Sequence, residues 1–478
     1  MLKFWASLFW VLCCFVGGNG ISHASEFQTC ADSELASELN STRCATVSVP
    51  LDYTAAYASK KPDKQLSLFV RKFPATEKKE GTIWLIAGGP GESGASFYAT
   101  ILVFQEAFPN FDLMVPDHRG TGYSSTICPQ ESVDSAAGKQ LTGAEWGGCI
   151  SYMYADESYV KAFSITNAAH DLAHLIEHYS GDGKVYVYGV SYGTQLSLRL
   201  LQLKQVELDG VILDSLVPLQ NDTKHDLSKR SFVVNQVGLE VLKRCDNSVQ
   251  CKTEKPLASM LDTLLATKPL LSDFNETLPA QKLSMVLGTL LDIPELRGRI
   301  AALIQQLSDN QTTLLIQTLD DIKTFYSSFN NGYPNFGSSI PLVQVISASE
   351  NNLRPALSKE SVAIEEQELL FTSPLAGLLA GNRMPTYERD RYYAKVPDVV
   401  PSILVLQGSL DPKTHINGAR QHVSALKNSG VTHMVEITDA PHFVALHSPK
   451  CFIDLSMDFV KGTEALPATC VDKKVKME

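Results

Sequence analysis

The sequence predicts an α/β fold with a mostly parallel central sheet and an inserted, mainly helical cap. Three observations support this prediction: short apolar runs that end at glycine, helical segments between those runs, and a long stretch without such runs. Of the 478 residues, 44% are hydrophobic and 19% are charged, so a large buried core is available. We expect a core of about 250 residues with a sizeable insertion, because single compact domains rarely grow much larger.

The apolar runs have the length and composition of strands. Several are rich in valine and isoleucine, as expected for strands that are buried on both faces of a parallel sheet. Residues 65–73 differ, since their apolar and polar side chains alternate as in a half-buried strand. The predicted buried strands are residues 82–87, 112–115, 184–188, 211–213, 403–406 and 434–437.

Residues 168–179 predict an amphipathic helix between two of these strands, because their apolar side chains recur on one face. His170, His174 and His178 line the opposite face at a spacing of one helical turn. Such a row can hold a metal ion, but catalytic zinc sites normally add a ligand from elsewhere. We interpret the row as a solvated polar face beside Asp171, and we predict neither a metal nor an organic cofactor.

A long segment of helical character interrupts the strand pattern. From about residue 220 to residue 395 polar and helix-like stretches dominate, for example residues 294–307. The strand pattern then resumes, which is typical of an insertion between two halves of one sheet. We predict a signal peptide at 1–24, core segments at 25–219 and 396–478, and a helical cap at 220–395.

The N-terminus resembles a secretory signal peptide. Lys3 is followed by an unbroken apolar run, residues 4–16, which is too short to span a bilayer. Ser22-His23-Ala24 is a small-x-small site, so we place cleavage after Ala24, and an uncleaved anchor is the alternative. Cleavage predicts a protein exported to the periplasm or secreted, without stable membrane insertion.

The cysteine count also suggests an exported protein. The chain has 10 cysteines, and removing Cys13 and Cys14 of the apolar run leaves eight. An even number in an exported chain predicts disulfides, although many pairings are possible. The pairing that closes four short loops is Cys30–Cys44, Cys128–Cys149, Cys245–Cys251 and Cys451–Cys470.

One motif, Gly189-Val190-Ser191-Tyr192-Gly193, points to a specific chemistry. It has the pattern G-x-S-x-G and stands directly after the predicted strand 184–188 and before a helical segment, residues 195–203. This is the context of a nucleophile elbow, in which a sharp strand-to-helix turn presents a serine hydroxyl above the sheet. The sequence therefore predicts an α/β-hydrolase fold with Ser191 as the nucleophile.

A serine hydroxyl is a weak nucleophile until a base takes its proton and an acid orients that base. In this fold the three residues follow one another as serine, acid and histidine. Asp411 follows the predicted strand 403–406, where a triad acid belongs, and Asp214 is the alternative. His442 follows the predicted strand 434–437 and is the expected base. The histidines that compete with it are His415, His422, His433 and, most closely, His447.

Hydrolysis through a tetrahedral intermediate also needs two backbone N–H groups directed at the developing oxyanion. The residue after the nucleophile supplies one in this fold, so we assign the amide of Tyr192. We expect the second from the glycine-rich loop 88–94. There we assign Gly89, since glycines let the backbone approach a substrate closely. A glycine turn without a catalytic role is the alternative.

Together these motifs resemble the prolyl aminopeptidase and tripeptidyl aminopeptidase family of serine peptidases. The resemblance rests on loop 88–94, on Asp117-His118-Arg119-Gly120-Thr121-Gly122-Tyr123-Ser124 and on the motif around Ser191. Residues 407–470 are similar to the C-terminal domain of the exported tripeptidyl aminopeptidase branch. Ala87, where prolyl aminopeptidases carry histidine, also fits that branch better. The resemblance implies release of residues from free peptide N-termini through an acyl-enzyme on Ser191.

The resemblance also implies how the substrate binds. Acidic cap residues bind the substrate's amino group in this family, and the best match here is Glu350. A surface carboxylate without such a role is the alternative. Because ester and amide hydrolysis share one mechanism, a carboxylic ester hydrolase is the second functional hypothesis, and a catalytically inactive binding protein is the third. The formal net charge of -11 without a basic block argues against a nucleic-acid partner.

Overall fold

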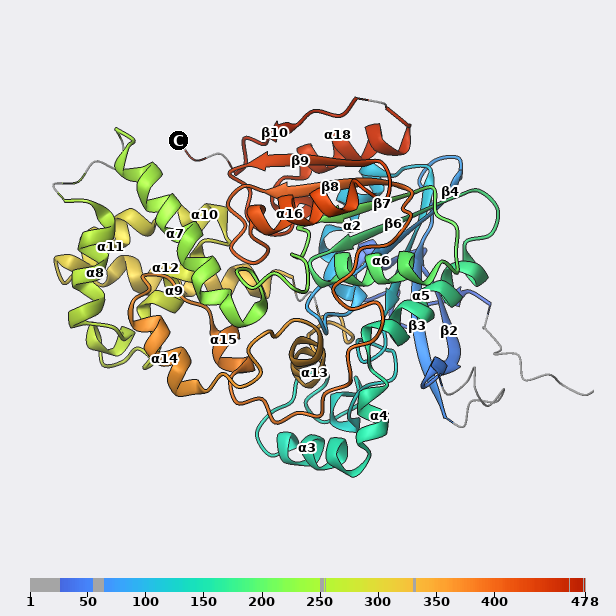
Figure 1. The fold of residues 1–478 in the computed structure, drawn as a ribbon, viewed down its shortest axis with the longest axis horizontal. Coiled ribbons are helices and arrows are strands. Elements are labelled where there is room, and N and C mark those ends of the chain that lie inside the picture. Colours follow the sequence, from blue (N-terminus) through green and yellow to red (C-terminus); the bar gives the residue numbers. More distant parts are fainter. Residues whose placement is uncertain are drawn as a thin grey trace, which may run out of the picture.

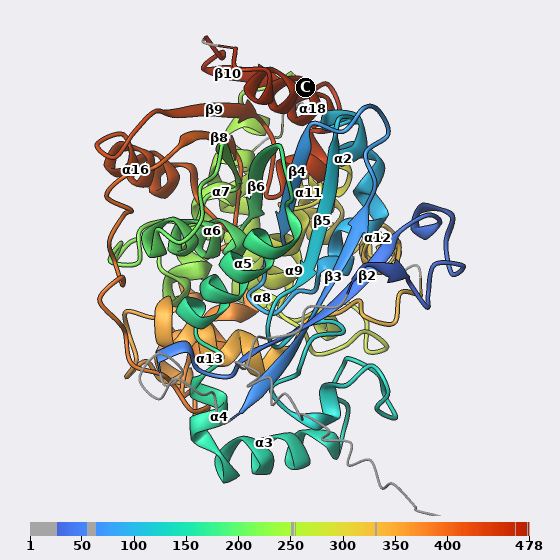
Figure 2. The ribbon, with the colours of Figure 1, turned by 90° about the vertical axis from the view of Figure 1, so that its right-hand side faces the viewer.

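The computed structural model describes residues 26–54, 64–249, 253, 255–329, 332–463, 465–475 and 477. The predicted signal peptide and Cys251 lie outside these described residues. The described strands form one sheet between two layers of helices, and a further group of helices stands beside it (Figure 1 and Figure 2).

The sheet has ten strands in the order β1-β2-β3-β5-β4-β6-β7-β8-β9-β10. The strands from β5 through β4 to β10 pair in parallel, while β1, β2 and β3 form an antiparallel edge. The predicted α/β class with a mostly parallel sheet is thus confirmed. The strands are β1 (Gln28–Thr29), β2 (Arg43–Pro50), β3 (Gln65–Phe73), β4 (Gly81–Ile86), β5 (Phe111–Asp117), β6 (Lys184–Val190), β7 (Gly210–Asp214), β8 (Ser402–Gly408), β9 (Thr432–Thr438) and β10 (Thr469–Val471).

Both faces of the sheet are covered, because successive side chains of each strand point to opposite sides. Trp84 and Ile86 of β4 belong to one buried cluster, and Ile83 and Leu85 belong to the other. The first cluster includes residues of α5 (Ile165–Tyr179), α6 (Tyr192–Leu203) and α16 (Ile416–Leu426). The second includes residues of α2 (Ile101–Ala107), α17 (Val444–His447) and α18 (Pro449–Val460).

The cap helices lie between β7 and β8 in the sequence, and most of them occupy the left of Figure 1, while α13 lies nearer its centre. Helices α7 to α11 share an apolar core that is separate from the two clusters on the sheet. The cap contains α7 (Arg230–Asp246), α8 (Leu257–Thr267), α9 (Leu283–Leu290), α10 (Pro294–Arg297), α11 (Ile300–Ser308), α12 (Thr313–Ser327), α13 (Ile340–Glu350), α14 (Lys359–Gln367) and α15 (Pro374–Leu379).

Short helices complete the described chain. Two α-helices follow β5 in the sequence, and five 3-10 helices are distributed among the loops. They are α3 (Glu145–Ala155), α4 (Glu157–Lys161), η1 (Ser37–Leu39), η2 (Gly94–Thr100), η3 (Pro129–Glu131), η4 (Leu227–Lys229) and η5 (Leu271–Asp273).

Disulfide bonds close three short loops of the core. The bonds Cys30–Cys44, Cys128–Cys149 and Cys451–Cys470 span 14, 21 and 19 residues of sequence. Each has the predicted partners, and Cys245 is also disulfide-bonded. Closing a loop of about 15 residues stabilises a fold by about 3 kcal/mol in the chain-entropy account.

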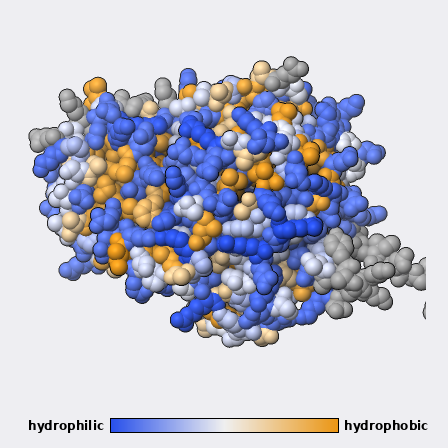
Figure 3. All heavy atoms as spheres, in the orientation of Figure 1, coloured by the Kyte–Doolittle hydropathy of each residue, from blue (hydrophilic) through white to orange (hydrophobic). Residues whose placement is uncertain are grey.

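The surface is mainly hydrophilic in the view of Figure 3, with hydrophobic residues gathered at the left, over the cap. Large apolar side chains that are individually exposed include Leu102, Ile364 and Val399, which is normal for a folded chain. None of the helices in the described part of the chain is long and apolar enough to cross a membrane.

Candidate active site

Ser191 occupies a strained turn between β6 and α6. Its backbone has φ 55° and ψ -123°, a conformation that non-glycine residues rarely adopt. The neighbouring glycines are required by packing. A Cβ at Gly189 would lie 2.4 Å from the carbonyl oxygen of Gly193, and one at Gly193 would lie 2.3 Å from that of Ile86. The G-x-S-x-G motif therefore forms the sharp strand-to-helix turn that presents a serine side chain.

Asp411 and His442 come together from two different loops. Asp411 follows β8 and His442 follows β9, and Nδ1 of His442 lies 2.9 Å from Oδ2 of Asp411. Both side chains are buried. The described residues include no hydrogen bond between Ser191 and His442, a contact that often tightens only when substrate binds. The acid and base pair is thus preformed, and His442 and Ser191 line one cavity.

The environment of Asp411 keeps its carboxylate ionised. The backbone N–H groups of Lys413 and Thr414 each donate to Oδ1 at 2.7 Å, and Gln407 Nε2 donates to Oδ2 at 3.1 Å. Burial alone would raise the pKa of Asp411, but the charge and hydrogen bond of His442 and the hydrogen bonds from Thr414 lower that pKa to about 2. An ionised Asp411 holds a proton on Nδ1 of His442 and leaves Nε2 free to act as a base.

The alternative acid, Asp214, has different partners. It is fully buried and accepts hydrogen bonds from the backbone N–H groups of Val444 and Ala445, at 2.8 and 2.9 Å. The hydroxyl of Tyr188 donates a third at 2.7 Å. Asp214 therefore satisfies the N-terminus of α17, directly after the loop that carries His442, and does not form the ion pair with that histidine.

The residues predicted to form the oxyanion hole, Gly89 and Tyr192, lie beside Ser191. Both line a small cavity together with Ser191. Gly89 has φ +106°, and a Cβ at Gly88 would lie 3.1 Å from the Cβ of Ser191, so the glycine loop passes close to the nucleophile. Among the described residues, neither the Gly89 nor the Tyr192 backbone N–H donates a hydrogen bond, which leaves both free for a substrate oxygen.

A segment of the cap holds the glycine loop in place. The hydroxyl of Ser93 donates to the carbonyl oxygen of Asn335 at 2.6 Å, and the N–H of Ser339 donates to that of Gly91 at 3.0 Å. The side chain of Asn335 also donates to Asp117 at 3.1 Å. The sequence does not predict this contact, because residues 333–339 carry no periodic pattern that places them.

Two cavities meet at Ser191. The larger has a volume of about 990 Å³ and extends beneath the cap, and the smaller has a volume of about 40 Å³. The walls that the two cavities share are formed by Gly89, Ser191, Arg230 and Lys413. A substrate bound at Ser191 would therefore pass two cationic side chains, neither of which the sequence analysis identified.

Four carboxylates line these cavities: Glu92, Glu131 and Asp292 line the larger one, and Asp226 lines the smaller one. Asp292 of the cap is buried, with Oδ2 2.5 Å from Nζ of Lys413 and Oδ1 without a hydrogen-bond partner. Burial tends to raise its pKa, but the charge of Lys413 keeps that pKa below the ordinary value. Glu92, on the glycine loop, has a pKa that burial raises. Asp226 lines the smaller cavity, and its buried Oδ1 also has no partner.

Glu350 lies apart from these four carboxylates. It ends α13, is 2% exposed, and its carboxylate is 3.6 Å from Nη2 of Arg199. Gln220 Nε2 donates to the same oxygen at 2.5 Å. Glu350 lines neither cavity at Ser191, so its predicted role as the ligand of a substrate amine gains no support from its position.

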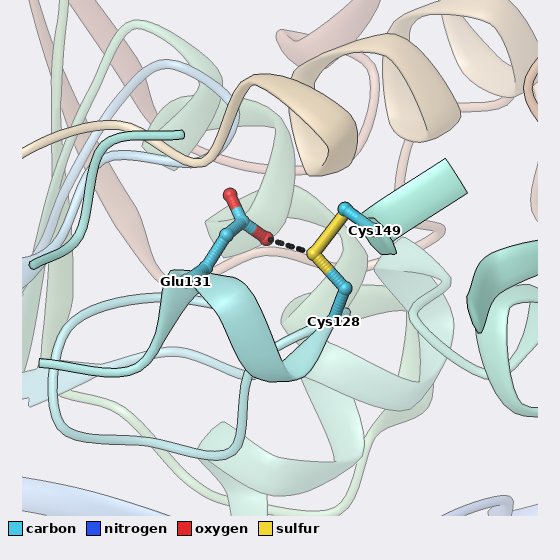
Figure 4. Close-up of side chains that lie close together, drawn as sticks. All are labelled: Cys128, Glu131 and Cys149. Atoms are coloured by element: carbon cyan, nitrogen blue, oxygen red, sulfur yellow. Dashed lines mark hydrogen bonds between the residues drawn. A yellow bond between two sulfur atoms is a disulfide. The ribbon is translucent and has the colours of Figure 1, made fainter. Parts of the chain in front are cut away.

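Among the described residues, one group of cysteine and carboxylate side chains has the spacing of a metal site, but it cannot bind a metal. Cys128, Glu131 and Cys149 approach within 4.8 Å of one another, but the two cysteines are disulfide-bonded (Figure 4). Disulfide sulfurs are not thiolates, and the thiolate is the metal ligand. His170, of the predicted histidine row, instead contacts Gln205 Oε1 at 2.8 Å.

Curated relatives match parts of the chain. It is similar to the putative hydrolase YuaR of Escherichia coli, 25% identical over 228 residues that are 45% of each protein. It is similar to the serine protease Hip1 of Mycobacterium tuberculosis, 29% identical over 36% of each protein. It also matches carboxylesterase B of Mycobacterium tuberculosis, 36% identical over 19% of this chain and 17% of that protein. The chain thus spans less than half the length of each relative.

The family assignment rests on a longer match. The family model of the α/β hydrolase fold matches residues 81–449. These residues include β4 to β9 and the whole cap. Within that range lie the strained Ser191 turn and the pair formed by Asp411 and His442. The chain belongs to the α/β hydrolase fold family.

Proposed function

We propose that the protein is an exported serine hydrolase that releases residues from free peptide N-termini through an acyl-enzyme on Ser191. The observation that carries the peptidase assignment is the large cavity at Ser191, whose lining includes Asp292, a buried carboxylate with one oxygen, Oδ1, that has no hydrogen-bond partner. The similarity to a protein named serine protease Hip1 supports the reaction class. The disulfides support export, because such bonds persist in oxidising compartments.

The geometry supports a two-step mechanism. Oγ of Ser191 attacks the scissile carbonyl carbon while Nε2 of His442 takes the hydroxyl proton, and the N–H groups of Gly89 and Tyr192 bind the resulting oxyanion. The intermediate collapses as His442 gives that proton to the leaving amine. A water molecule, deprotonated by His442, then attacks the acyl carbonyl carbon. The bond to Oγ of Ser191 breaks as His442 returns the proton to that oxygen, and the N-terminal fragment is released. Asp411 keeps the imidazole ring in one tautomer throughout both steps.

Recognition of the substrate's ammonium group is assigned to Asp292 and Glu92, which line the large cavity together with Ser191. Oδ1 of Asp292 is buried without a partner although Oδ2 pairs with Lys413. An unsatisfied buried carboxylate oxygen is costly, and an ammonium group would satisfy it with a charge-assisted hydrogen bond. Glu92 lines the same cavity. This assignment replaces Glu350 with residues that share a cavity with the nucleophile.

A carboxylic ester hydrolase is the second candidate function. Large apolar side chains line the same cavity and would suit an uncharged acyl or alcohol group: Trp146, Phe325, Phe329, Phe336 and Phe443. The match to a protein named carboxylesterase B favours this alternative. The catalytic residues would be unchanged, because ester and amide hydrolysis use the same triad chemistry.

Three sets of chromogenic substrates distinguish the two functions. The sets are prolyl and tripeptidyl amides with free amines, their N-acetylated counterparts, and short-chain esters. We expect the mature protein to cleave the free-amine amides, and acetylation to abolish cleavage. Ser191→Ala should lower kcat by about 10⁶-fold. Cleavage of esters alone would refute the aminopeptidase proposal and leave the triad in place.

The amine-binding assignment has a matched test. Asp292→Asn should raise KM for free-amine amides by about ten- to hundredfold, because it removes one charge-assisted hydrogen bond. Glu350→Gln is the control, since that carboxylate is buried beside Arg199 and outside both cavities. If Glu350→Gln raised KM while Asp292→Asn did not, the original family-based assignment would be correct.

A further inference from the structure

Arg230 stands out among the buried and half-buried arginines of the described chain. It is the first residue of α7 and lines both cavities at Ser191. In the described part of the protein, no hydrogen bond or ion pair involves its guanidinium group. The buried arginines elsewhere all have such partners; they are Arg71, Arg119, Arg199 and Arg297.

The charges that face Arg230 are already engaged by other groups. The carboxylates whose charges act on the guanidinium group of Arg230 are those of Asp411 and Asp292. Asp411 accepts from His442, and Asp292 is paired with Lys413 at 2.5 Å. Burial lowers the pKa of Arg230 to about 10, so the group remains cationic at neutral pH. Its donors therefore face the cavity without a counter-ion from this part of the chain.

Arg230 is half-buried, and a guanidinium group without an internal partner can bind an anionic group of a ligand through charge-assisted hydrogen bonds. Guanidinium presents a planar fork of donors that matches the two oxygens of a carboxylate. Since Gly89, Ser191, Arg230 and Lys413 form the walls common to both cavities, a group held by Arg230 lies next to the bond that is cut.

We propose that Arg230 is a specificity-determining residue that binds a carboxylate of the substrate close to the scissile bond. This inference rests on the proposed function of Ser191 and deepens it, since it names the class of substrate. The carboxylate is either the side chain of an aspartate or glutamate residue or the C-terminal group of a short peptide. In both cases the preferred substrate carries one negative charge near the reacting carbonyl group.

The test compares substrates that differ only in that charge. One arm pairs glutamyl with glutaminyl residues on either side of the scissile bond, and the other pairs peptides that end in a free acid with their C-terminal amides. We expect the wild-type enzyme to prefer the acid in at least one arm by about ten- to hundredfold in kcat/KM. The arm that shows the preference identifies the source of the carboxylate.

Variants assign the preference to one side chain. Arg230→Gln should reduce the acid-to-neutral ratio to about 1, and Arg230→Lys should retain part of it because the charge remains without the fork. Lys229→Gln is the matched control, since it removes one positive charge at the adjacent position. Lys229 lies over the ring of Phe232 and lines neither cavity. The control should keep the wild-type ratio.

Two results would overturn the proposal: equal rates for acid and neutral substrates in both arms, or a preference that persists in Arg230→Gln. A third substrate pair separates this failure from failure of the proposed function. The nitrophenyl esters of adipic acid and adipamic acid report the same charge difference on an ester. If the enzyme cleaved no peptide but preferred the adipic acid ester, and lost that preference in Arg230→Gln, the peptidase proposal would be refuted. The carboxylate site at Arg230 would be supported.

Discussion

The orientation of His442 depends on a few hydrogen bonds that converge on Asp411. Its carboxylate receives the imidazole N–H of His442 on Oδ2 and the backbone N–H groups of Lys413 and Thr414 on Oδ1. These contacts fix both the ring and its tautomer. The neighbouring Asp214 performs a different task, since its oxygens bind the backbone at the start of α17.

Exchanging each acid for its amide separates these roles. Asp411→Asn should lower kcat by about 10⁴-fold, because an amide favours the wrong tautomer of His442. Asp214→Asn should instead lower the free energy of unfolding by about 1–3 kcal/mol, since an amide cannot accept from both N–H groups. Turnover and urea denaturation of both variants check this. A larger loss of kcat in Asp214→Asn than in Asp411→Asn would show that the acids are misassigned.

At this scale the sequence was informative only where chemistry has a local pattern. Ser191 could be predicted from glycines at fixed spacing, and Asp411 and His442 from their positions after strands. Asp292 and Arg230 have no such signal, because they lie in the cap and reach the cavity only through its tertiary packing. Glu350 was proposed from a family match, and the structure pairs it with Arg199 instead.

Among the elements, the cap segment 333–339 has a role beyond covering the cavity. It contacts the glycine loop through the hydrogen bond from Ser93 to Asn335 and through that from Ser339 to Gly91. Asn335 is fully buried and also donates to Asp117. The segment thereby supports the loop that supplies the Gly89 N–H, so cap and core are coupled at the catalytic centre.

Asn335→Ala should therefore lower kcat more than it changes KM. It should also reduce the free energy of unfolding by about 1–3 kcal/mol, because Asp117 loses a donor while buried. Steady-state kinetics and denaturation would measure the two effects. The control is Asn382→Ala, which removes a hydrogen bond to the N–H of Met384 without contact to the glycine loop. Equal changes in kcat for both variants would argue against a positioning role for Asn335.

Element boundaries were harder to predict than element types. We expected a strand to stop at Pro116, but β5 continues to Asp117. Its pairing with β4 ends at Met114, so the missing N–H of proline removes no hydrogen bond on that side. The helical stretch 294–307 is two helices, α10 and α11, separated at Gly298, a residue with low helix propensity. The local sequence pattern does not show which neighbouring strand pairs with each residue, so it cannot fix where a strand such as β5 ends.

For the molecule as a whole, buried histidines make stability depend on pH. Burial lowers the pKa of His118, His422 and His447 to about 4 from 6.5. Between these two values the unfolded chain binds more protons than the folded one, so stability rises with pH and falls as the solution is acidified. Each histidine contributes up to about 3 kcal/mol of this loss by pH 4.

Urea denaturation from about pH 7.5 down to about pH 4.5 should show this loss. His422→Gln should make the pH profile less steep, because that variant keeps a donor for the carbonyl oxygen of Val217 but no longer titrates. A profile that is equally steep in wild type and His422→Gln would show that other groups determine the acid sensitivity.

Chemical labelling of the nucleophile tests the assignment of Ser191, His442 and Asp411 most directly. A fluorophosphonate reacts with an activated serine and leaves an adduct that peptide mass spectrometry can locate. We predict a single adduct on Ser191, absent in Ser191→Ala and formed much more slowly in Asp411→Asn. An adduct on another residue, or labelling that is unaffected by Asp411→Asn, would contradict the assignment of Ser191, His442 and Asp411.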